Sequence, residues 1–387
     1  MRKSYVGALL LPLCLSIVAC SSKGNLPPPA KLTKLESSIP LKRDWHQVKL
    51  DERNRQLHGV DIYADESLFL WVDDQGRLHA QDAQTGKCLW VFELEDAKVT
   101  SSAGANSETV VVVTSDAQTI ALDKTNGTEL WRGKVSSESL VAPQIADGIV
   151  IVYCVDGKVF GLNATDGSER WRYNSRVPVI SLHGNATPAV ADGRVFLGLS
   201  EGELVALDLW SGEERWKMPL GVARGRSELD RMVDVDATPV VEDGVVYSAA
   251  YQGNVVALKL RTGRMIWSNE LSTAQDIAVG DKHVYVVDEE SILYALDKKT
   301  GHVLWKQDAL QWRYVTSPVV YQSYLVVGDL EGYLHWMDSD KGTLVHRIRT
   351  DFHHFDAKPV VSDGKLYAMT RTGIIDVLEL DNTSSQK

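Results

Sequence analysis

Two short stretches of this 387-residue chain carry side chains that could do chemistry. In the first, Asp234 and Asp236 are separated by one residue. On a strand this spacing puts both carboxylates on one face, where they could hold a cation or meet a basic partner. In the second, His353 and His354 precede Asp356. Charged and polar groups of this kind are more often solvated than ligating, so we expect no metal at either stretch. The patterns G-x-x-x-x-G-K-[ST], H-E-x-x-H and C-x-x-C do not occur in the chain, and the sequence predicts no enzyme and no cofactor.

The start of the chain carries a different chemistry, that of covalent processing. Residues 1–19 combine a positively charged start with a short apolar stretch, which is typical of a signal peptide and too short to span a bilayer comfortably. The stretch ends in Ile-Val-Ala followed by Cys20. This resembles the bacterial lipobox and predicts lipid attachment at Cys20. An ordinary secretory signal cleaved near Ala19 is the alternative. Ser21 rather than Asp after the cysteine favours the outer membrane, with the folded body in the periplasm.

Charge and composition narrow the choice of partners. The formal net charge is −11, and loss of a signal with two basic residues makes the mature chain more acidic still. We therefore expect no nucleic acid partner, and no membrane contact except through the lipid. Residues 20–42 predict the lipid anchor and a flexible tether, because they are rich in Pro, Ser and Lys without apolar periodicity. Residues 43–381 are assigned to the folded body and residues 382–387 to a C-terminal tail.

A repeated phrase of fifteen residues dominates this body. Its clearest copies are GRLHAQDAQTGKCLW at 76–90, GELVALDLWSGEERW at 202–216 and SILYALDKKTGHVLW at 291–305. Short strands that recur with a period of roughly forty residues are typical of a β-propeller. Eight such third strands occur, so the sequence predicts an all-β fold, an eight-bladed β-propeller of four-stranded antiparallel blades.

The units share a set of turn signals between their expected strands. The turn between the first two expected strands is most often Asp-Gly, as at 147–148, 192–193, 243–244 and 363–364. A glycine opens the third strand, and a Thr-Gly turn or a variant of it leads to a fourth strand that ends on tryptophan in six of the units. The phrase resembles the tryptophan-docking repeat of quinoprotein-type propellers, in which the indole packs on the backbone and a small residue of a neighbouring unit. The small residue ten positions before each indole, such as Ala80 before Trp90, is expected to fill that role. The docking residues are Trp45, Trp90, Trp131, Trp171, Trp216, Trp267 and Trp305.

The two ends of the body are incomplete in complementary ways. The eighth third strand has no tryptophan strand after it, whereas Trp45 lies in a tryptophan strand with nothing before it. We expect residues 43–50 to complete the last blade, which closes the ring and removes its free edges. The seventh unit carries Trp336 where the small residue is expected and His346 where the tryptophan is expected, a large-for-small exchange.

A binding surface is predicted on one face of the ring. The Asp-Gly and Thr-Gly turns share one face, and the connections between blades share the other with all the irregular length. The surplus falls in two neighbouring connections, at 172–185 and 217–236. Long irregular loops on a rigid scaffold usually serve function. Their apolar residues beside charged ones suit a protein interface; the expected contacts are Ile180, Leu182, His183, Arg231, Asp234 and Asp236.

Three stretches of the chain resemble the BamB family of outer-membrane β-barrel assembly lipoproteins. They are SLHGNATP at 181–188, SELDRMVDVDATP at 227–239 and VVGDLEGYLHW at 326–336. The resemblance implies a scaffold that binds a POTRA domain of BamA through the first two stretches, with unfolded barrel precursors as a second candidate partner. His183 stands where the family usually has arginine. The alternative is a quinone (PQQ)-dependent dehydrogenase-like propeller, although the adjacent Cys-Cys pair of those enzymes is missing here.

Overall fold

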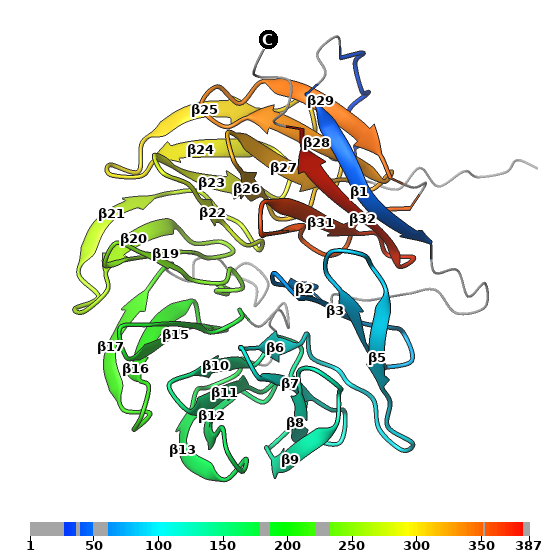
Figure 1. The fold of residues 1–387 in the computed structure, drawn as a ribbon. Coiled ribbons are helices and arrows are strands. Elements are labelled where there is room, and N and C mark those ends of the chain that lie inside the picture. Colours follow the sequence, from blue (N-terminus) through cyan, green and yellow to red (C-terminus); the bar gives the residue numbers. More distant parts are fainter. Residues whose placement is uncertain are drawn as a thin grey trace, which may run out of the picture.

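The computed structural model describes residues 27–35, 39–48, 61–178, 186–221, 233–350 and 353–381. These residues form eight four-stranded antiparallel sheets arranged as the blades of a ring (Figure 1). The prediction of an eight-bladed β-propeller is confirmed. No helix in the described part of the chain is long and apolar enough to cross a membrane.

Each of the first seven blades is a simple meander, numbered here in chain order. Blade 1 is β2 (Tyr63–Ala64), β3 (Leu68–Val72), β4 (Leu78–Asp82) and β5 (Cys88–Phe92); blade 2 is β6 (Gly104–Ala105), β7 (Thr109–Val113), β8 (Gln118–Asp123) and β9 (Glu129–Lys134); blade 3 is β10 (Gln144–Ala146), β11 (Ile149–Tyr153), β12 (Lys158–Asn163) and β13 (Glu169–Asn174); blade 4 is β14 (Ala189–Ala191), β15 (Arg194–Leu199), β16 (Glu203–Asp208) and β17 (Glu214–Pro219). Blade 5 is β18 (Val240–Glu242), β19 (Val245–Ala249), β20 (Val255–Lys259) and β21 (Met265–Asn269); blade 6 is β22 (Ala278–Val279), β23 (His283–Val287), β24 (Leu293–Asp297) and β25 (Val303–Gln307); blade 7 is β26 (Val319–Tyr321), β27 (Tyr324–Gly328), β28 (Tyr333–Asp338) and β29 (Leu344–Arg349).

The hydrophobic core is divided among the blade interfaces. The described residues form eight apolar clusters, and each cluster combines residues of two neighbouring blades. The second strands are covered on both faces, which explains why they read as continuous apolar runs such as TVVVV in β7 and IVIVY in β11. No blade could bury its two faces without its neighbours.

The docking tryptophans connect each blade to the next one. The indole N–H of Trp131 donates to Ala164 O of blade 3 at 2.8 Å, and its ring lies over Gly167 of the turn that follows. The same pair of contacts, a carbonyl and a turn glycine, holds Trp45, Trp90, Trp171, Trp216, Trp267 and Trp305. The expectation that the small residue belongs to the neighbouring unit is wrong. Ala121 is the cross-strand partner of Trp131 within the same blade, because the ten-residue spacing spans a single hairpin.

Blade 8 closes the ring with the two ends of the chain. It consists of β30 (Val360–Ser362), β31 (Lys365–Met369), β32 (Ile374–Leu380) and β1 (Leu41–Val48), and β1 pairs antiparallel with β32 from Leu41↔Leu380 to Val48↔Ile374. Figure 1 shows the blue β1 beside the red β32. The buried carboxylate of Asp376 receives an Arg43 hydrogen bond and lies 2.6 Å from His46 Nδ1. The predicted closure by the start of the mature chain is confirmed, with the strand beginning at Leu41.

This closure also explains the exchange in blade 7. In every other blade the fourth-strand tryptophan docks on a glycine in the next blade's turn between its third and fourth strands. Blade 8 has no such turn, because β32 and β1 come from opposite ends of the chain. His346 therefore has no equivalent glycine to dock on, and Trp336 is fully buried across from it at the small-residue position.

The segment before β1 differs from the expected free tether. Residues 27–35 lie against blade 7, and Leu32 packs on the apolar cluster between blades 6 and 7. The first two residues of β1 also fall inside the range assigned to the tether.

Candidate functional site

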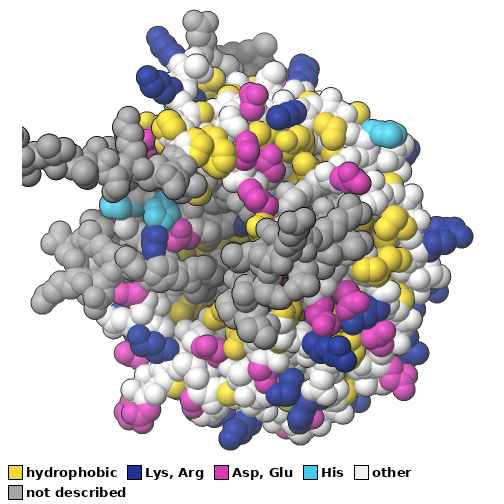
Figure 2. All heavy atoms as spheres, turned by 180° about the vertical axis from the view of Figure 1, so that it is seen from behind, with side chains coloured by type: hydrophobic (Ala, Val, Ile, Leu, Met, Phe, Trp, Pro, Cys, Tyr) yellow, Lys and Arg dark blue, Asp and Glu magenta, His cyan; other side chains and the backbone are white. Residues whose placement is uncertain are grey.

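The two faces of the ring carry different parts of each blade, as predicted. We call the face with the turns between first and second strands and between third and fourth strands the turn face. The other face, with the connections between blades, is the loop face; Figure 2 looks onto it, and its described acidic and basic side chains are interspersed there. Of the expected partner contacts, Asp234 and Asp236 are described. Ile180, Leu182, His183 and Arg231 lie outside the described residues, as does the lipid site Cys20.

Asp234 and Asp236 lie where the connection from blade 4 returns to blade 5. An isolated antiparallel bridge fixes this segment, since the Tyr251 N–H donates to Asp234 O at 2.8 Å. On the other side, the backbone of blade 4 at Gly198 passes close to Val235 of this segment. A Cβ on Gly198 would lie 2.2 Å from Val235 O, so a glycine is needed for the backbone to pass here. The segment is therefore held in place on both sides.

The two carboxyl groups do meet, but they are not a solvated pair. The Asp234 residue is 1% exposed, whereas Asp236 is partly exposed. Burial, the charge of Asp234 and a hydrogen bond between the two side chains raise the pKa of Asp236 to about 8. Burial and the nearby Asp234 charge likewise raise the pKa of Tyr153. Asp234 supports the segment from inside, and Asp236 is the group of this pair that a partner can reach.

A serine in this region matches a pattern that sequence reasoning overlooked. Residues 198–202 read G-L-S-E-G, the spacing of a nucleophile elbow, which requires a strand-to-helix turn. Here the stretch spans the end of β15 and the hairpin turn to β16. Ser200 is 7% exposed and hydrogen-bonds with the buried phenol of Tyr153. The local structure gives this serine a packing role.

The histidine stretch is held by an arginine. The Arg371 guanidinium donates to His354 Nε2 at 2.8 Å, and His354 Nε2 also lies 3.0 Å from the Asp356 carboxylate. Phe355 between them is buried and contacts Gly328. Within the described residues no group of three or more His, Cys, Asp or Glu side chains is arranged to hold a metal ion.

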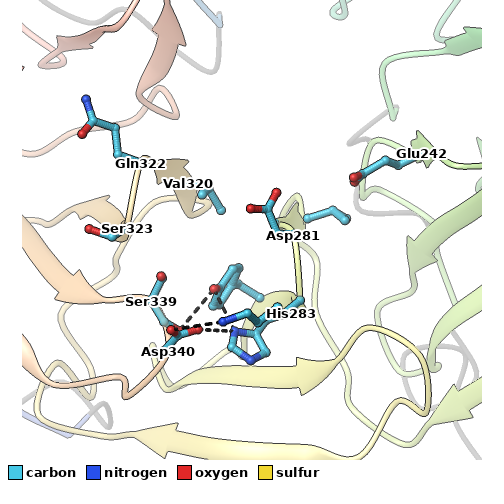
Figure 3. Close-up of a pocket in the computed structure, with 12 residues that line it drawn as sticks. Glu242, Asp281, His283, Val320, Gln322, Ser323, Ser339 and Asp340 are labelled. Atoms are coloured by element: carbon cyan, nitrogen blue, oxygen red, sulfur yellow. Dashed lines mark hydrogen bonds and ion pairs between the residues drawn. The ribbon is translucent and has the colours of Figure 1, made fainter.

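A cavity of about 550 Å³ opens on the turn face between blades 6 and 7. Figure 3 shows Asp281 and Asp340 on neighbouring turns and the contact between His283 and Asp340. That contact is 3.7 Å long, Lys282 lies 3.6 Å from the same carboxylate, and His283 Nδ1 is 3.2 Å from Tyr285 Oη. These groups pair with one another, and the cavity lies on the face opposite the long connections.

Charged side chains also cross the middle of the ring. Lys358, just before blade 8, forms a 2.6 Å ion pair with Asp276, just before blade 6. The carboxyl group of Asp61, before blade 1, interacts with the charge of the same ammonium group. Burial raises the pKa of Asp61 to about 6, Lys358 opposes this shift, and Asp276 adds to it. This cross-ring contact could not be found from sequence, because the three residues are far apart in the chain.

Comparisons with known proteins agree over nearly the whole chain. A family model described as outer membrane protein assembly factor BamB matches residues 74–307. Relatives of that name are 36% identical in Yersinia pestis, over 79% of this chain and 80% of theirs. They are 38% identical in Salmonella typhimurium, over 82% and 83%, and 32% identical in Kangiella koreensis, over 96% and 95%.

Solved structures give the same result at the level of the fold. The crystal structure of BamB from Moraxella catarrhalis matches with a TM-score of 0.80 and 27% identity, over 88% of this chain and 99% of that chain. A quinohemoprotein alcohol dehydrogenase from Comamonas testosteroni matches with a TM-score of 0.69 over 88% and 76% of the two chains. Its 13% identity shows a shared fold alone.

Proposed function

This chain belongs to the BamB family of outer membrane protein assembly factors, and we propose that it is a lipid-anchored scaffold that binds the POTRA region of BamA. The observation that carries the function is the match to relatives of nearly equal length that are all named as assembly factors. It acts as a non-enzymatic component of the barrel assembly machinery at the outer membrane. The dehydrogenase alternative is weaker, because that likeness is confined to the fold.

Attachment to the membrane is proposed at Cys20. Burial of acyl chains stabilises membrane binding by ~0.8 kcal/mol per methylene, and one chain gives only marginal residence. Several chains on one cysteine would suffice, and they would leave the acidic propeller in the periplasm. Cys20→Ala should release the protein from the membrane fraction. Its persistence there would rule out this anchor.

The proposed docking surface is the loop face around the connections that precede blades 4 and 5. Asp236 supports this assignment as a partly exposed carboxyl group at the foot of the longer connection, on a segment held by Tyr251 and Gly198. A rigid ring can hold the periplasmic domains of BamA in one orientation. Direct capture of unfolded precursors by strand addition ranks second, because the closed ring has few free edges.

Co-purification of BamA from detergent-solubilised envelopes tests the proposal. Leu182→Ala should reduce BamA recovery at least about tenfold if the loop supplies a central apolar contact. Trp210→Ala is the matched control, because Trp210 is an apolar side chain 49% exposed on the turn face of blade 4. Equal recovery of BamA with wild type and both variants, all folded, would overturn this choice of surface.

A further inference from the structure

The segment that precedes β1 is docked along the seam between blades 6 and 7. The Ala30 N–H donates to Gln311 O at 2.9 Å, and Leu32 packs on the apolar cluster shared by these blades. Further along, Arg347 of β29 donates to Thr33 O at 3.3 Å. Figure 1 shows this dark blue segment beside β29. We call residues 27–35 the strap.

The strap completes the contacts of a buried guanidinium group. The Arg313 side chain is 3% exposed and donates to Asp329 at 2.7 Å and to Glu331 at 2.5 Å. Its remaining terminal nitrogen donates to Ala30 O at 2.9 Å. A buried charge needs all its hydrogen-bonding directions filled. Without the strap, one side of this guanidinium would lose its protein acceptor.

Arg347, which donates to Thr33 O of the strap, belongs to the same hydrogen-bond network as Arg313. The buried Asp329 carboxylate lies 2.8 Å from His335 Nε2, and Arg347 donates to His335 Nδ1 at 3.3 Å. Burial lowers the pKa of His335, which favours the neutral ring that can accept this hydrogen bond. Asp329, Glu331 and His335 all belong to the stretch VVGDLEGYLHW at 326–336. The BamA contact proposed above does not involve this stretch.

Local backbone geometry supports a built site. Trp312 and Tyr314, on either side of Arg313, have φ values of 60° and 48°, a left-handed conformation that aromatic residues rarely adopt. Strain of this kind persists where the surrounding structure requires it. On the other side, the strap begins with three consecutive prolines, at 27–29. Their restricted backbone lowers the conformational entropy lost on docking.

We propose that the strap fastens the propeller close to its lipid anchor, so that the loop face at the seam of blades 6 and 7 is the membrane-proximal part of the molecule. This inference rests on the proposed lipid attachment at Cys20. A free chain from Cys20 to Leu41 could extend about 70 Å, whereas the chain from Cys20 to Pro27 could extend only about 25 Å. The strap therefore sets both the height and the orientation of the ring.

Hydrogen exchange of the lipoprotein, purified without BamA, tests the docking itself. The Ala30 amide should exchange at least about tenfold more slowly than in an unstructured chain. Leu32→Ser should abolish this protection, because it removes the apolar contact without altering any blade. Lys31→Ser is the matched control at the exposed neighbouring position and should keep the protection. An unprotected Ala30 amide in the wild type would overturn the proposal.

A pair of insertions tests the height above the membrane. The exposed thiol of Cys88 can carry a donor dye, with acceptor lipids in vesicles of phosphatidylethanolamine and phosphatidylglycerol. Ten Gly/Ser residues inserted after Gly24 lengthen the chain between lipid and strap, and energy transfer should fall. The same ten residues inserted after Glu36 lie beyond the strap and should leave energy transfer unchanged. Equal losses from both insertions would show an undocked strap and overturn the proposal.

Failure of the proposed function gives a different result. If Cys20 carries no lipid, the protein will not attach to the vesicles, yet Ala30 protection can still be measured in solution. If the loop face does not bind BamA, co-purification fails while both strap measurements keep their expected values.

Discussion

Each docking tryptophan depends on one residue of the next blade that must be glycine. Gly167 has a φ of +72°, and a Cβ there would lie 2.4 Å from the Trp131 ring. Two separate constraints, a left-handed backbone and ring contact, therefore act on the same position. Gly148 in blade 3 has a similar φ of +77°, but a Cβ there would meet nothing within 4 Å, so it carries the first constraint alone.

Alanine at these two glycines should separate the constraints. Gly148→Ala should cost about 1 kcal/mol of unfolding free energy from backbone strain. Gly167→Ala should cost about 2 kcal/mol more, because the new methyl group displaces the indole. Chemical denaturation of both variants measures the difference. Equal costs would show that ring contact with the glycine contributes little to the joint between blades.

Asp236 makes stability depend on pH. Its pKa is raised to about 8 in the folded protein, from an ordinary value near 4. Between these values the folded state holds a proton that the unfolded chain has released. The contribution of this group to stability therefore falls as pH rises from about 4 to about 8.

Asp236→Asn should remove this dependence. We expect the variant to gain stability relative to wild type as pH is raised from 5 to 8, measured by denaturant midpoints at each pH. Asp166→Asn is the control, since hydrogen bonds from Ser168 lower the pKa of Asp166 and its ionisation is complete above pH 5. If the difference in stability between Asp236→Asn and wild type stays constant from pH 5 to 8, the pKa of Asp236 is not raised in the folded protein.

At the scale of elements, one strand decides whether the ring is closed. β1 pairs with the whole length of β32. Arg43 of β1 donates to Asp376 of β32, and the Trp45 indole of β1 donates to Ala83 O of blade 1. The residues that flank these two strands also meet, since the Asp381 N–H donates to Pro40 O at 2.7 Å. Without β1, β32 becomes an exposed edge strand, which favours pairing with other chains.

A protein that begins at Lys49 lacks both the strap and β1 and should therefore associate and lose cooperative unfolding. A matched protein that begins at Ile39 keeps β1 and should remain monomeric. Light scattering and thermal unfolding of the two proteins distinguish them. A monomeric, cooperatively unfolding protein without β1 would mean that closure is not required for the fold.

At the scale of the whole molecule, each blade of the ring packs on the next, and a charged contact also joins blades that are not neighbours. The Lys358–Asp276 pair joins segments before blades 8 and 6, while Asp61 adds a second carboxylate. Lys358 opposes the rise of the Asp61 pKa. Without this lysine the Asp61 pKa should rise further, which extends to higher pH the range over which stability is lost.

Lys358→Met should thus destabilise the protein more at pH 8 than at pH 5. The expected loss at pH 8 is about 2 kcal/mol, the scale of a charged hydrogen bond. Thermal midpoints at both pH values measure it, and Asp276→Asn in the same background should restore part of the loss at pH 8. An equal loss at both pH values would mean that the carboxylates do not repel each other there.

The local pattern was enough to determine the architecture. Turn glycines, alternating strands and the recurring tryptophan fix one blade, and eight copies with complementary broken ends fix a closed ring. Short-range rules suffice for these features, because each hairpin is specified by adjacent residues. The same patterns located the irregular connections that form the proposed docking surface.

Contacts between distant parts of the chain were decided only by the tertiary structure. The strap on Arg313 and the Lys358–Asp276 pair join residues that no spacing relates. The repeat places a turn glycine in each unit, but only the packed ring shows that each tryptophan docks on the glycine of the next blade. Asp234 and Asp236 were identified as a pair, but their burial and shared hydrogen bond depend on blades 3 to 5 packing around them. Sequence determines the units of a repeat fold, whereas solvent access and pKa depend on how the closed ring surrounds each side chain.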